Sequence, residues 1–440
     1  MDEAPKPPVE ELDVGLEVYY TDVLPIGGKL KKEPEDFIVN EISDKPPEKR
    51  GGEYTIARVT VRNWETNRLI KLLSQKLGIS KRRIGFAGTK DKRAITSQLM
   101  SFKCPIDDVL SISLKDVKIE DAYQSNRELT IGDLYGNDFR ITIRDITISK
   151  NETQQRADNV IQTLLKIGGA PNFFGIQRFG SIRPITHLIG RNILRRDFEQ
   201  AVMTYIAYPL PYESQAAREA RERLERERDF TEALDYYPKM YSFERTMIHY
   251  LSRKPGDWTG ALEQVPDNLK MMFIHAYQSY LFNRILSERI RRGIPLNEPQ
   301  VGDLIIPLNK KNLPDHYRYI SVTSSNLNEM VEVVKRGLGF VSGIIMGRDA
   351  VFAGGEVGEI ERKITSSEGI ERSDYDLPEV RGLSSKGIRR ELISPLFDLK
   401  WRVNELLPGD VTLELVFTLY KGDYATSFVR ELIKGGLLDY

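Results

Sequence analysis

The sequence is poor in the residues that bind metal ions or form disulfides. Only one cysteine, Cys104, occurs among 440 residues, so neither an intrachain disulfide nor a multi-cysteine zinc site can form. The four histidines do not form an HExxH or HxxxH pattern, so we expect no metal site: His187, His249, His275 and His316. We interpret His275, in an apolar helical stripe, as a satisfied core histidine.

The chain also lacks net charge and long apolar runs. Its 64 basic and 64 acidic side chains give a formal net charge of zero, so any nucleic-acid interaction has to rest on local clusters of cations. The longest apolar runs fall short of a membrane span. Residues 1–8 are polar and rich in proline, unlike a signal peptide. We therefore predict a cytoplasmic protein with no membrane association.

What is present is an ordinary globular composition, with 40% hydrophobic and 29% charged residues. The length suggests two or three domains. Strands and helices alternate irregularly, which indicates a mixed α+β fold. We expect a loose acidic arm over residues 1–20 and loops over 354–380. Strand-like patterns occupy 37–42, 53–62, 139–143 and 411–417, and helical patterns occupy 66–77, 153–166, 268–292 and 426–435.

Residues 213–229 consist mostly of Glu, Arg and Ala. Glu219 precedes Arg223 by four residues, and Glu222 precedes Arg226 by four. This spacing predicts a solvated helix with ion pairs along its surface. Phosphate binding by its arginines is disfavoured, because each has a glutamate nearby.

The most informative segment is 84–96, where a short apolar run ends in glycines and is followed by Asp91. Nearby cations keep such a carboxylate ionised, and it could act as a nucleophile, a base or an electrostatic stabiliser. The alternative is a solvated turn between two strands. The spacing of a nucleotide-binding P-loop is absent. The cations that could hold a polyanion here are Lys81, Arg82, Arg83, Lys90, Lys92 and Arg93.

Three other segments combine aromatic rings with cations or amides: Lys31 with 34–37, residues 172–180, and residues 421–426. Rings beside Arg, Asn and Gln suit the binding of an unstacked base. The alternative is packing, both for the phenylalanines of 172–180 and for Tyr424.

Taken together, these motifs resemble the TruD family of tRNA pseudouridine synthases, and their wording is most similar to archaeal members. Tyr424 stands where many relatives have Phe, and Thr89 varies in the family; either ring can stack on a base. The matching segments occur in family order: Lys31 with 34–37, 85–94, 172–180, 275–283 and 425–431.

The resemblance implies that a uridine of tRNA, typically at position 13 in the D arm, is isomerised to pseudouridine without a cofactor. Asp91 would be the essential carboxylate, and Lys31 would lie beside it and keep it charged. Whether Asp91 attacks the ribose, attacks the uracil or removes a ribose proton stays open. Phe37 and Tyr424 would contact the flipped base, Asn172 would bind nearby, and Phe174 would form part of the pocket wall. The 81–93 cations would hold the RNA backbone.

The resemblance also implies an α+β fold: a pseudouridine-synthase catalytic domain with a mixed, mostly antiparallel sheet, interrupted by an inserted α+β domain. We place the catalytic domain at 1–170 plus 395–440 and the insertion at 171–394. We expect tRNA as the partner and infer no obligate protein partner. Two other functions stay open: a catalytically silent RNA-binding module, and a hydrolase that uses Asp91 to release uracil.

Overall fold

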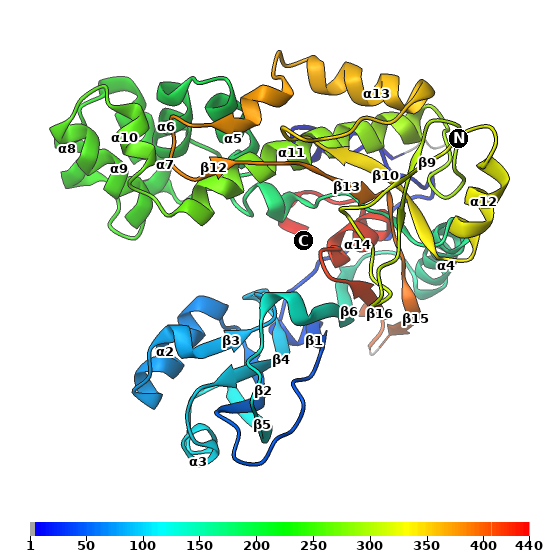
Figure 1. The fold of residues 1–440 in the computed structure, drawn as a ribbon, viewed down its shortest axis with the longest axis horizontal. Helices are drawn as coiled ribbons and strands as arrows, with labels where there is room; N and C mark the ends of the chain where they lie inside the picture. Colours follow the sequence, from blue (N-terminus) through cyan, green and yellow to red (C-terminus); the bar gives the residue numbers. More distant parts are fainter. Residues whose placement is uncertain (1–4, 406, 440) are drawn as a thin grey trace. The chain divides into compact units, whose positions relative to one another are not determined.

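The computed structural model describes residues 5–405 and 407–439. It divides into two compact units (Figure 1). The first, here called the sheet unit, contains Thr21–Ala170 and Ser394–Tyr440. The second, the insert unit, contains Lys6–Tyr20 and Pro171–Ile393. The chain passes from one unit to the other between Tyr20 and Thr21, at β7 (Ala170–Pro171) and at β14 (Ile393–Ser394).

Residues 6–20 differ from our expectation, because they pack into the insert unit instead of forming a loose arm of the catalytic domain. They include the short helix α1 (Val9–Leu12), after which Val14 and Leu16 are buried. Asn283 donates a hydrogen bond to the Val14 carbonyl over 3.0 Å. Apolar burial and a satisfied backbone therefore hold this segment in place, which its acidic composition did not indicate.

The sheet unit is built on an eight-stranded sheet with the order β15-β16-β6-β1-β4-β2-β5, in which β3 pairs with β4. Among these neighbours only β1 and β4 run parallel, so the expected mixed, mostly antiparallel sheet is confirmed. The strands are β1 (Phe37–Ser43), β2 (Tyr54–Arg62), β3 (Ile84–Phe86), β4 (Ile95–Phe102), β5 (Val117–Ser125), β6 (Leu134–Ile146), β15 (Phe397–Glu405) and β16 (Val411–Tyr420).

Helices pack on one face of this sheet. The stripe Leu69, Ile70 and Leu73 of α2 belongs to one buried cluster with Val59 and Val61 of β2. On the β16 side, Phe417 packs edge-on against Phe428 of α14, with ring centroids 5.1 Å apart. The register places Phe37, Val39 and Glu41 of β1 on this same face. The helices are α2 (Thr66–Leu77), α3 (Ile106–Leu110), α4 (Lys150–Lys166) and α14 (Ala425–Ile433).

The opposite face of the sheet is polar around β1, β6 and β16. Asn40, Asp138 and Arg140 line a shallow groove there, and Arg140 lies 3.4 Å from a Glu414 carboxylate oxygen. One apolar face and one polar face are typical of an antiparallel sheet that is covered on one side.

The insert unit combines a helical part with a small sheet of order β13-β10-β8-β9. Its strands are β8 (Leu304–Pro307), β9 (Ile320–Ser321), β10 (Gly339–Ile345) and β13 (Ile388–Glu391), with a separate pair β11 (Asp376–Leu377) and β12 (Leu383–Ser384). Its longer helices are α5 (Thr186–Leu194), α6 (Phe198–Ala207), α7 (Gln215–Glu227), α8 (Phe230–Tyr236), α9 (Ser242–Arg253), α10 (Trp258–Leu262), α11 (Asp267–Arg291), α12 (Leu327–Lys335) and α13 (Gly355–Ser366).

The long helix α11 organises the insert unit. It packs closely against α5, where a Cβ on Gly190 would lie 2.0 Å from the Phe273 carbonyl oxygen. Only glycine permits this approach of two helix backbones. The expected loop over 354–380 is wrong for α13, because Val357, Ile360 and Ile364 form a buried helical stripe within that acidic segment.

Helix α7 confirms the solvated helix expected in 213–229, except for one buried stripe of Ala217, Ala220, Arg221 and Leu224. The ion pairs along it join Arg218 to Glu222 and Arg223 to Glu227, instead of the two pairs expected from the spacing. Arg221 of this helix is fully buried.

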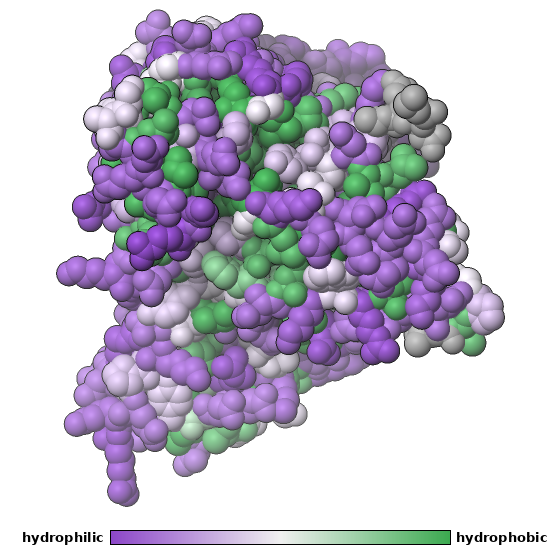
Figure 2. Space-filling model, turned by 90° about the vertical axis from the view of Figure 1, so that its right-hand side faces the viewer, coloured by the Kyte–Doolittle hydropathy of each residue, from purple (hydrophilic) through white to green (hydrophobic). Residues whose placement is uncertain are grey.

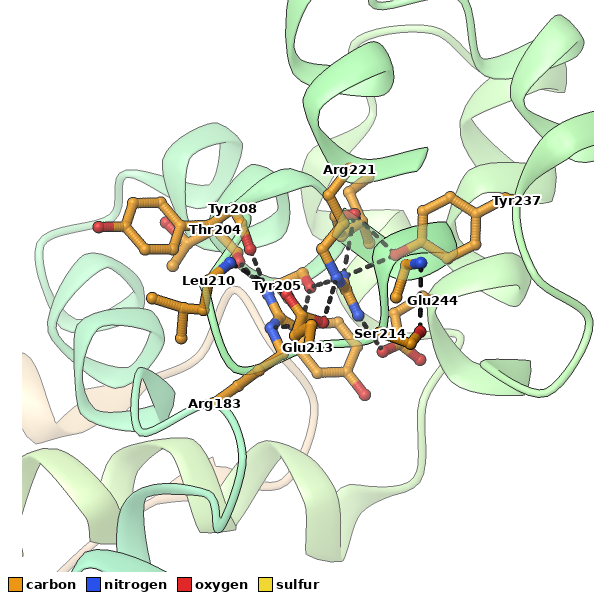
Figure 3. Close-up of polar contacts among 12 residues, drawn as sticks. Arg183, Thr204, Tyr205, Tyr208, Leu210, Glu213, Ser214, Arg221, Tyr237 and Glu244 are labelled. Carbon is orange, nitrogen blue, oxygen red and sulfur yellow. Dashed lines mark hydrogen bonds and ion pairs between the residues drawn. The ribbon is translucent and has the colours of Figure 1, made fainter. Parts of the chain in front are cut away.

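Arg221 lies in a buried polar cluster, which we call the arginine cluster: Arg183, Glu213, Arg221, Tyr237 and Glu244 (Figure 3). Arg221 donates to Glu213 over 2.9 Å, to Glu244 over 3.2 Å and to the Tyr237 hydroxyl over 2.6 Å. Burial disfavours the Arg221 charge, but Tyr237 and the two glutamates outweigh burial and raise its pKa. Two arginines and two glutamates balance in charge, so the cluster ties α6, α7 and α9 together without a net buried charge.

Charged residues gather on the surface. Figure 2 shows one face on which hydrophilic side chains cover most of the area, with smaller apolar patches between them. Across the part of the chain that the structure describes, every helix is too short or too polar to cross a membrane.

Candidate active site

The sheet unit brings Lys31 and Asp91 together. Asp91 lies between β3 and β4, and its side chain is 51% exposed. The Lys31 ammonium lies 3.8 Å from Asp91 Oδ2, although the Lys31 side chain is only 11% exposed. The same ammonium lies 4.3 Å from the centroid of the Phe37 ring. A cation held between a ring and a carboxylate is restricted in position, so Asp91 has a fixed positive neighbour on one side and solvent on the other.

The turn before β1 fixes the position of Lys31. Lys31 adopts a left-handed backbone conformation with φ 52°, which costs a non-glycine residue roughly 1 kcal/mol. The following turn is closed by Asp36, which accepts hydrogen bonds from the Glu33 amide over 2.9 Å and from Arg144 Nε over 2.7 Å. Asp36 is buried, so this turn is anchored in the fold. Local strain that the surroundings maintain is common at functional sites.

Lys90, directly before Asp91, has a different position from the one we expected. Its ammonium lies 2.6 Å from Glu41 Oε2, and both side chains are buried, with 5% and 0% exposed. Its backbone amide donates to Thr66 Oγ1 over 3.0 Å. The expected contact of Lys90 with the RNA backbone is therefore wrong for this geometry, because its charge is already paired inside the protein. Lys90 instead anchors the residue next to Asp91 to β1 and to α2.

The other five cations of the cluster are exposed. Lys81, Arg82 and Arg83 form the short helical turn η2 (Lys81–Arg83), and Lys92 and Arg93 follow Asp91. In residues 5–405 and 407–439, no carboxylate lies within 4.0 Å of any of them. Exposed cations that have no carboxylate partner among the described residues suit a polyanionic substrate.

The two aromatic residues expected in the sheet unit occupy different environments. Phe37 is almost fully buried, and its ring packs edge-on against Phe139 at 6.0 Å. Its ring lies below the Lys31 ammonium with little surface exposed, and its expected contact with the base stays a prediction. Tyr424 is half-buried at the N-cap of α14, directly after Asp423, whose carboxylate accepts a hydrogen bond from Ser394 over 2.7 Å. Tyr424 thus keeps ring surface that a base could contact.

Asn172 and Phe174 lie together in the insert unit. Asn172 is fully buried; its amide donates to the Glu391 carbonyl over 3.2 Å and accepts from Arg390 over 2.5 Å. The Arg390 guanidinium lies over the Phe174 ring at 4.4 Å. Asn283, within the 275–283 motif, exchanges hydrogen bonds with the backbone of Phe174. We had not singled out Arg390, because nothing in its local sequence indicates this contact.

Two further titratable side chains are Glu41 in the sheet unit and His275 in the insert unit. Glu41 is committed to Lys90, so it is not available as a second acid or base. In the described residues, no group of three or more His, Cys, Asp or Glu side chains could hold a metal ion. Burial and Arg178 lower the pKa of His275 to about 4, so this histidine stays neutral near pH 7.

Comparison with known proteins places this chain in one family. The family model described as tRNA pseudouridine synthase D (TruD) matches residues 13–432. A relative from Methanococcoides burtonii, named probable tRNA pseudouridine synthase D, is 42% identical over 97% of this chain and 98% of its own length. A relative of the same name from Thermococcus gammatolerans is 39% identical over 93% and 95%. The solved structure of the putative tRNA pseudouridine synthase D from Methanosarcina mazei is 40% identical, with a TM-score of 0.86 over 98% of this chain and 99% of that one.

Proposed function

Because the chain belongs to the TruD family of tRNA pseudouridine synthases, we propose that Asp91 is the essential carboxylate of this enzyme and that its target is uridine 13 in the D arm. The coarser activity follows from the family: the enzyme isomerises a uridine of tRNA to pseudouridine. The bond between N1 and the ribose C1′ breaks, the uracil turns, and C5 forms a new bond to C1′. C5 loses a proton and N1 gains one, so the product has the same atoms as the substrate.

The observation that carries the role of Asp91 is its combination of exposure and a fixed cation. Its carboxylate is half exposed, and Lys31 lies 3.8 Å away on the protein side. Attack on the ribose, attack on the uracil and removal of a ribose proton all need an ionised carboxylate that the substrate can reach. A preorganised cation stabilises that charged form without rearrangement during the reaction.

We assign Lys31 the role of holding this charge in place. Its ammonium is confined by the Phe37 ring below it and by the strained turn from which it emerges. Lysine can serve here because the site needs a point charge, and bidentate binding of the carboxylate would occupy both oxygens.

The remaining residues would bind the substrate. Tyr424 offers a ring for the flipped base, and stacking returns roughly 1–3 kcal/mol of the few kcal/mol that flipping costs. Asn172 and Phe174 of the insert unit would also help to bind the substrate, and Phe37 would act through Lys31. Phosphates would be held by Lys81, Arg82, Arg83, Lys92 and Arg93. Because the substrate is tRNA, we also propose that the enzyme works in the cytoplasm.

The test is pseudouridine mapping of an unmodified tRNA transcript treated with wild type or with Asp91→Asn. We expect wild type to modify position 13 and Asp91→Asn to lose at least about 1,000-fold in rate, equivalent to about 4 kcal/mol. Binding of tRNA and the free energy of unfolding should stay near the wild-type values, because asparagine has almost the same size as aspartate. Asp121→Asn, an exposed aspartate on β5, is the matched control and should be fully active.

Each alternative has its own result in this experiment. Full turnover by Asp91→Asn would remove Asp91 from the reaction. Pseudouridine at another nucleotide would replace position 13 as the target while leaving the role of Asp91 intact. Free uracil in place of pseudouridine would indicate a hydrolase, and binding without any product would indicate a silent RNA-binding protein.

A further inference from the structure

The insert unit exposes a tyrosine on the loop that joins β8 to β9. This loop, residues 308–319, is here called the tyrosine loop. Its Tyr317 is 86% exposed, and its neighbour Tyr319 is also exposed. Leaving a large ring in water gives up the favourable free energy of burying it. None of the proposed base-binding residues lies in this loop, so its exposed rings need another explanation.

The backbone of the tyrosine loop is fixed by its own hydrogen bonds. The Asn309 side chain accepts from the amides of Lys311 over 2.8 Å and Leu313 over 3.2 Å. The Asp315 amide donates to the Pro307 carbonyl over 2.9 Å, and the Asp315 carboxylate accepts from the Tyr317 amide over 3.3 Å. Tyr317 thus lies on a hydrogen-bonded turn, and this preorganisation lowers the entropy that is lost when a ligand binds to it.

The residue before Tyr317 connects the loop to the small sheet. His316 Nε2 lies 2.7 Å from Glu391 Oε2, and Glu391 is buried at the end of β13. Burial alone would raise the pKa of Glu391, but the hydrogen bond to His316 and the Arg390 charge lower it. The backbone carbonyl of the same Glu391 accepts a hydrogen bond from Asn172. The tyrosine loop and Asn172 are therefore supported by one residue.

The tyrosine loop and the nearby end of α12 also carry cations. Lys310 and Arg318 are exposed in the loop itself. Arg336, at the end of α12, is brought to the same end of the sheet because the Leu308 amide donates to the Leu338 carbonyl over 3.2 Å. Among the residues that the structure describes, none of these three cations has a carboxylate within 4.0 Å. The tyrosine loop therefore carries exposed cations as well as exposed rings.

We propose that the tyrosine loop is a second RNA-binding surface, on which Tyr317 stacks on an unpaired base of the tRNA while Lys310 and Arg318 contact the flanking phosphates. Every base has a π-face, so an exposed ring accepts any unpaired nucleotide, and adjacent cations track the backbone. This inference rests on tRNA being the substrate and adds a contact that is separate from Asp91.

The experiment measures tRNA affinity by fluorescence anisotropy at several salt concentrations, together with the rate of pseudouridine formation. We expect Tyr317→Ala to weaken binding about 5- to 150-fold, the range that corresponds to the loss of one base stack. The salt dependence should keep its slope, because a neutral ring releases no counterions. Arg318→Gln should instead lower that slope by about 1. At saturating tRNA, both variants should keep the wild-type kcat.

Controls separate stacking from other effects. Tyr317→Phe keeps the ring and should bind like wild type; binding as weak as that of Tyr317→Ala would overturn stacking. Tyr208→Ala removes another exposed tyrosine of the insert unit, at the end of α6, and should bind normally. Wild-type affinity in Tyr317→Ala would overturn the inference, and would leave the proposed function standing as long as the wild-type enzyme makes pseudouridine.

Discussion

The Asp91 site and the arginine cluster both set cations against carboxylates, yet they treat the carboxylate in opposite ways. In the arginine cluster, Glu213 accepts hydrogen bonds from Arg221 and from the Leu210 amide, and it is buried. At the candidate active site, Asp91 has the Lys31 ammonium at 3.8 Å and is half open to solvent. A buried carboxylate whose oxygens already accept hydrogen bonds stabilises the fold. A carboxylate that is half exposed keeps oxygen lone pairs with which a substrate can interact.

The difference follows from the cost of burying charge. An ion loses several kcal/mol of hydration in the protein interior, so a buried pair needs additional hydrogen bonds to be stable. The arginine cluster supplies these from main-chain carbonyls and from Tyr237. Asp91 keeps part of its hydration and can be left with one cation. Lys90, the residue directly before Asp91, forms a buried ion pair with Glu41.

The largest effect on stability should come from the arginine cluster. Arg221→Met leaves Glu213 and Glu244 without their shared cation, so we expect the free energy of unfolding to fall by about 3–5 kcal/mol. Urea unfolding measures this loss, and activity per folded molecule should not change. Arg218→Met, on the exposed side of α7, is the control and should cost less than about 1 kcal/mol. Equal effects of the two variants would contradict the distinction between buried and exposed pairs.

A smaller effect, on catalysis, should separate two neighbouring lysines. Lys90→Met removes the anchor beside Asp91 and leaves Glu41 buried without its cation, so stability should fall as well. Per folded molecule, we expect kcat to fall roughly 10- to 100-fold with little change in KM for tRNA. Lys92→Met removes an exposed cation, and it should raise KM while leaving kcat intact. Steady-state kinetics on the tRNA transcript measures both constants. Wild type, Glu41→Gln, Lys90→Met and the double variant Glu41→Gln/Lys90→Met form a double-mutant cycle. The coupling energy between the two residues in that cycle should be about 1–3 kcal/mol.

Should Lys90→Met raise only KM, our interpretation of Lys90 as an anchor would be wrong and its role as a phosphate contact would return. Should Lys92→Met lower kcat, the cations around Asp91 would not have separate roles.

The smallest effect concerns a buried group that carries no charge near pH 7. His187 packs between Phe179 and Tyr280, and burial, with a further contribution from Arg191, lowers its pKa from 6.5 to about 3. The unfolded chain therefore binds a proton below pH 6.5 that the folded protein does not, so stability falls as the pH falls towards 3. Between pH 7 and pH 5 this amounts to about 2 kcal/mol.

Urea unfolding of wild type and His187→Gln at the two pH values measures this contribution, since glutamine does not titrate and other groups affect both proteins alike. Wild type should lose about 2 kcal/mol more than the variant on going from pH 7 to pH 5. An equal loss in both proteins, or an NMR titration of the His187 ring with a midpoint near 6.5, would contradict the lowered pKa.

The sequence predicted the elements whose periodicity is strong and local. The strands around residues 37–42 and 411–417 and the helices around 66–77 and 268–292 are confirmed within a few residues. Helix α13 and residues 6–20 were missed, because an acidic composition hid a few buried apolar side chains. Composition averages over a segment, whereas packing depends on a single face of it.

The candidate site also has features that the sequence predicted and features that only the structure showed. Residue type singled out Asp91, but only the family resemblance placed Lys31 beside it, and the structure has the two side chains 3.8 Å apart. The same motif could not distinguish Lys90 from Lys92, since both are lysines beside one aspartate. Their environments differ only because Glu41 and Thr66 come from other elements and meet Lys90 alone.

The sequence alone determined the chemistry that this protein can perform: an aspartate among cations, rings beside amides, and almost no metal-binding side chains. The tertiary structure decided which of those charges are free to act. Burial raises the cost of an unpaired charge, so the fold neutralises Lys90 and Arg221 with glutamates that are distant in sequence. Among the residues that the structure describes, Asp91 is half exposed and Tyr317 is 86% exposed. Exposure depends on which segments pack together, and no local sequence pattern records it.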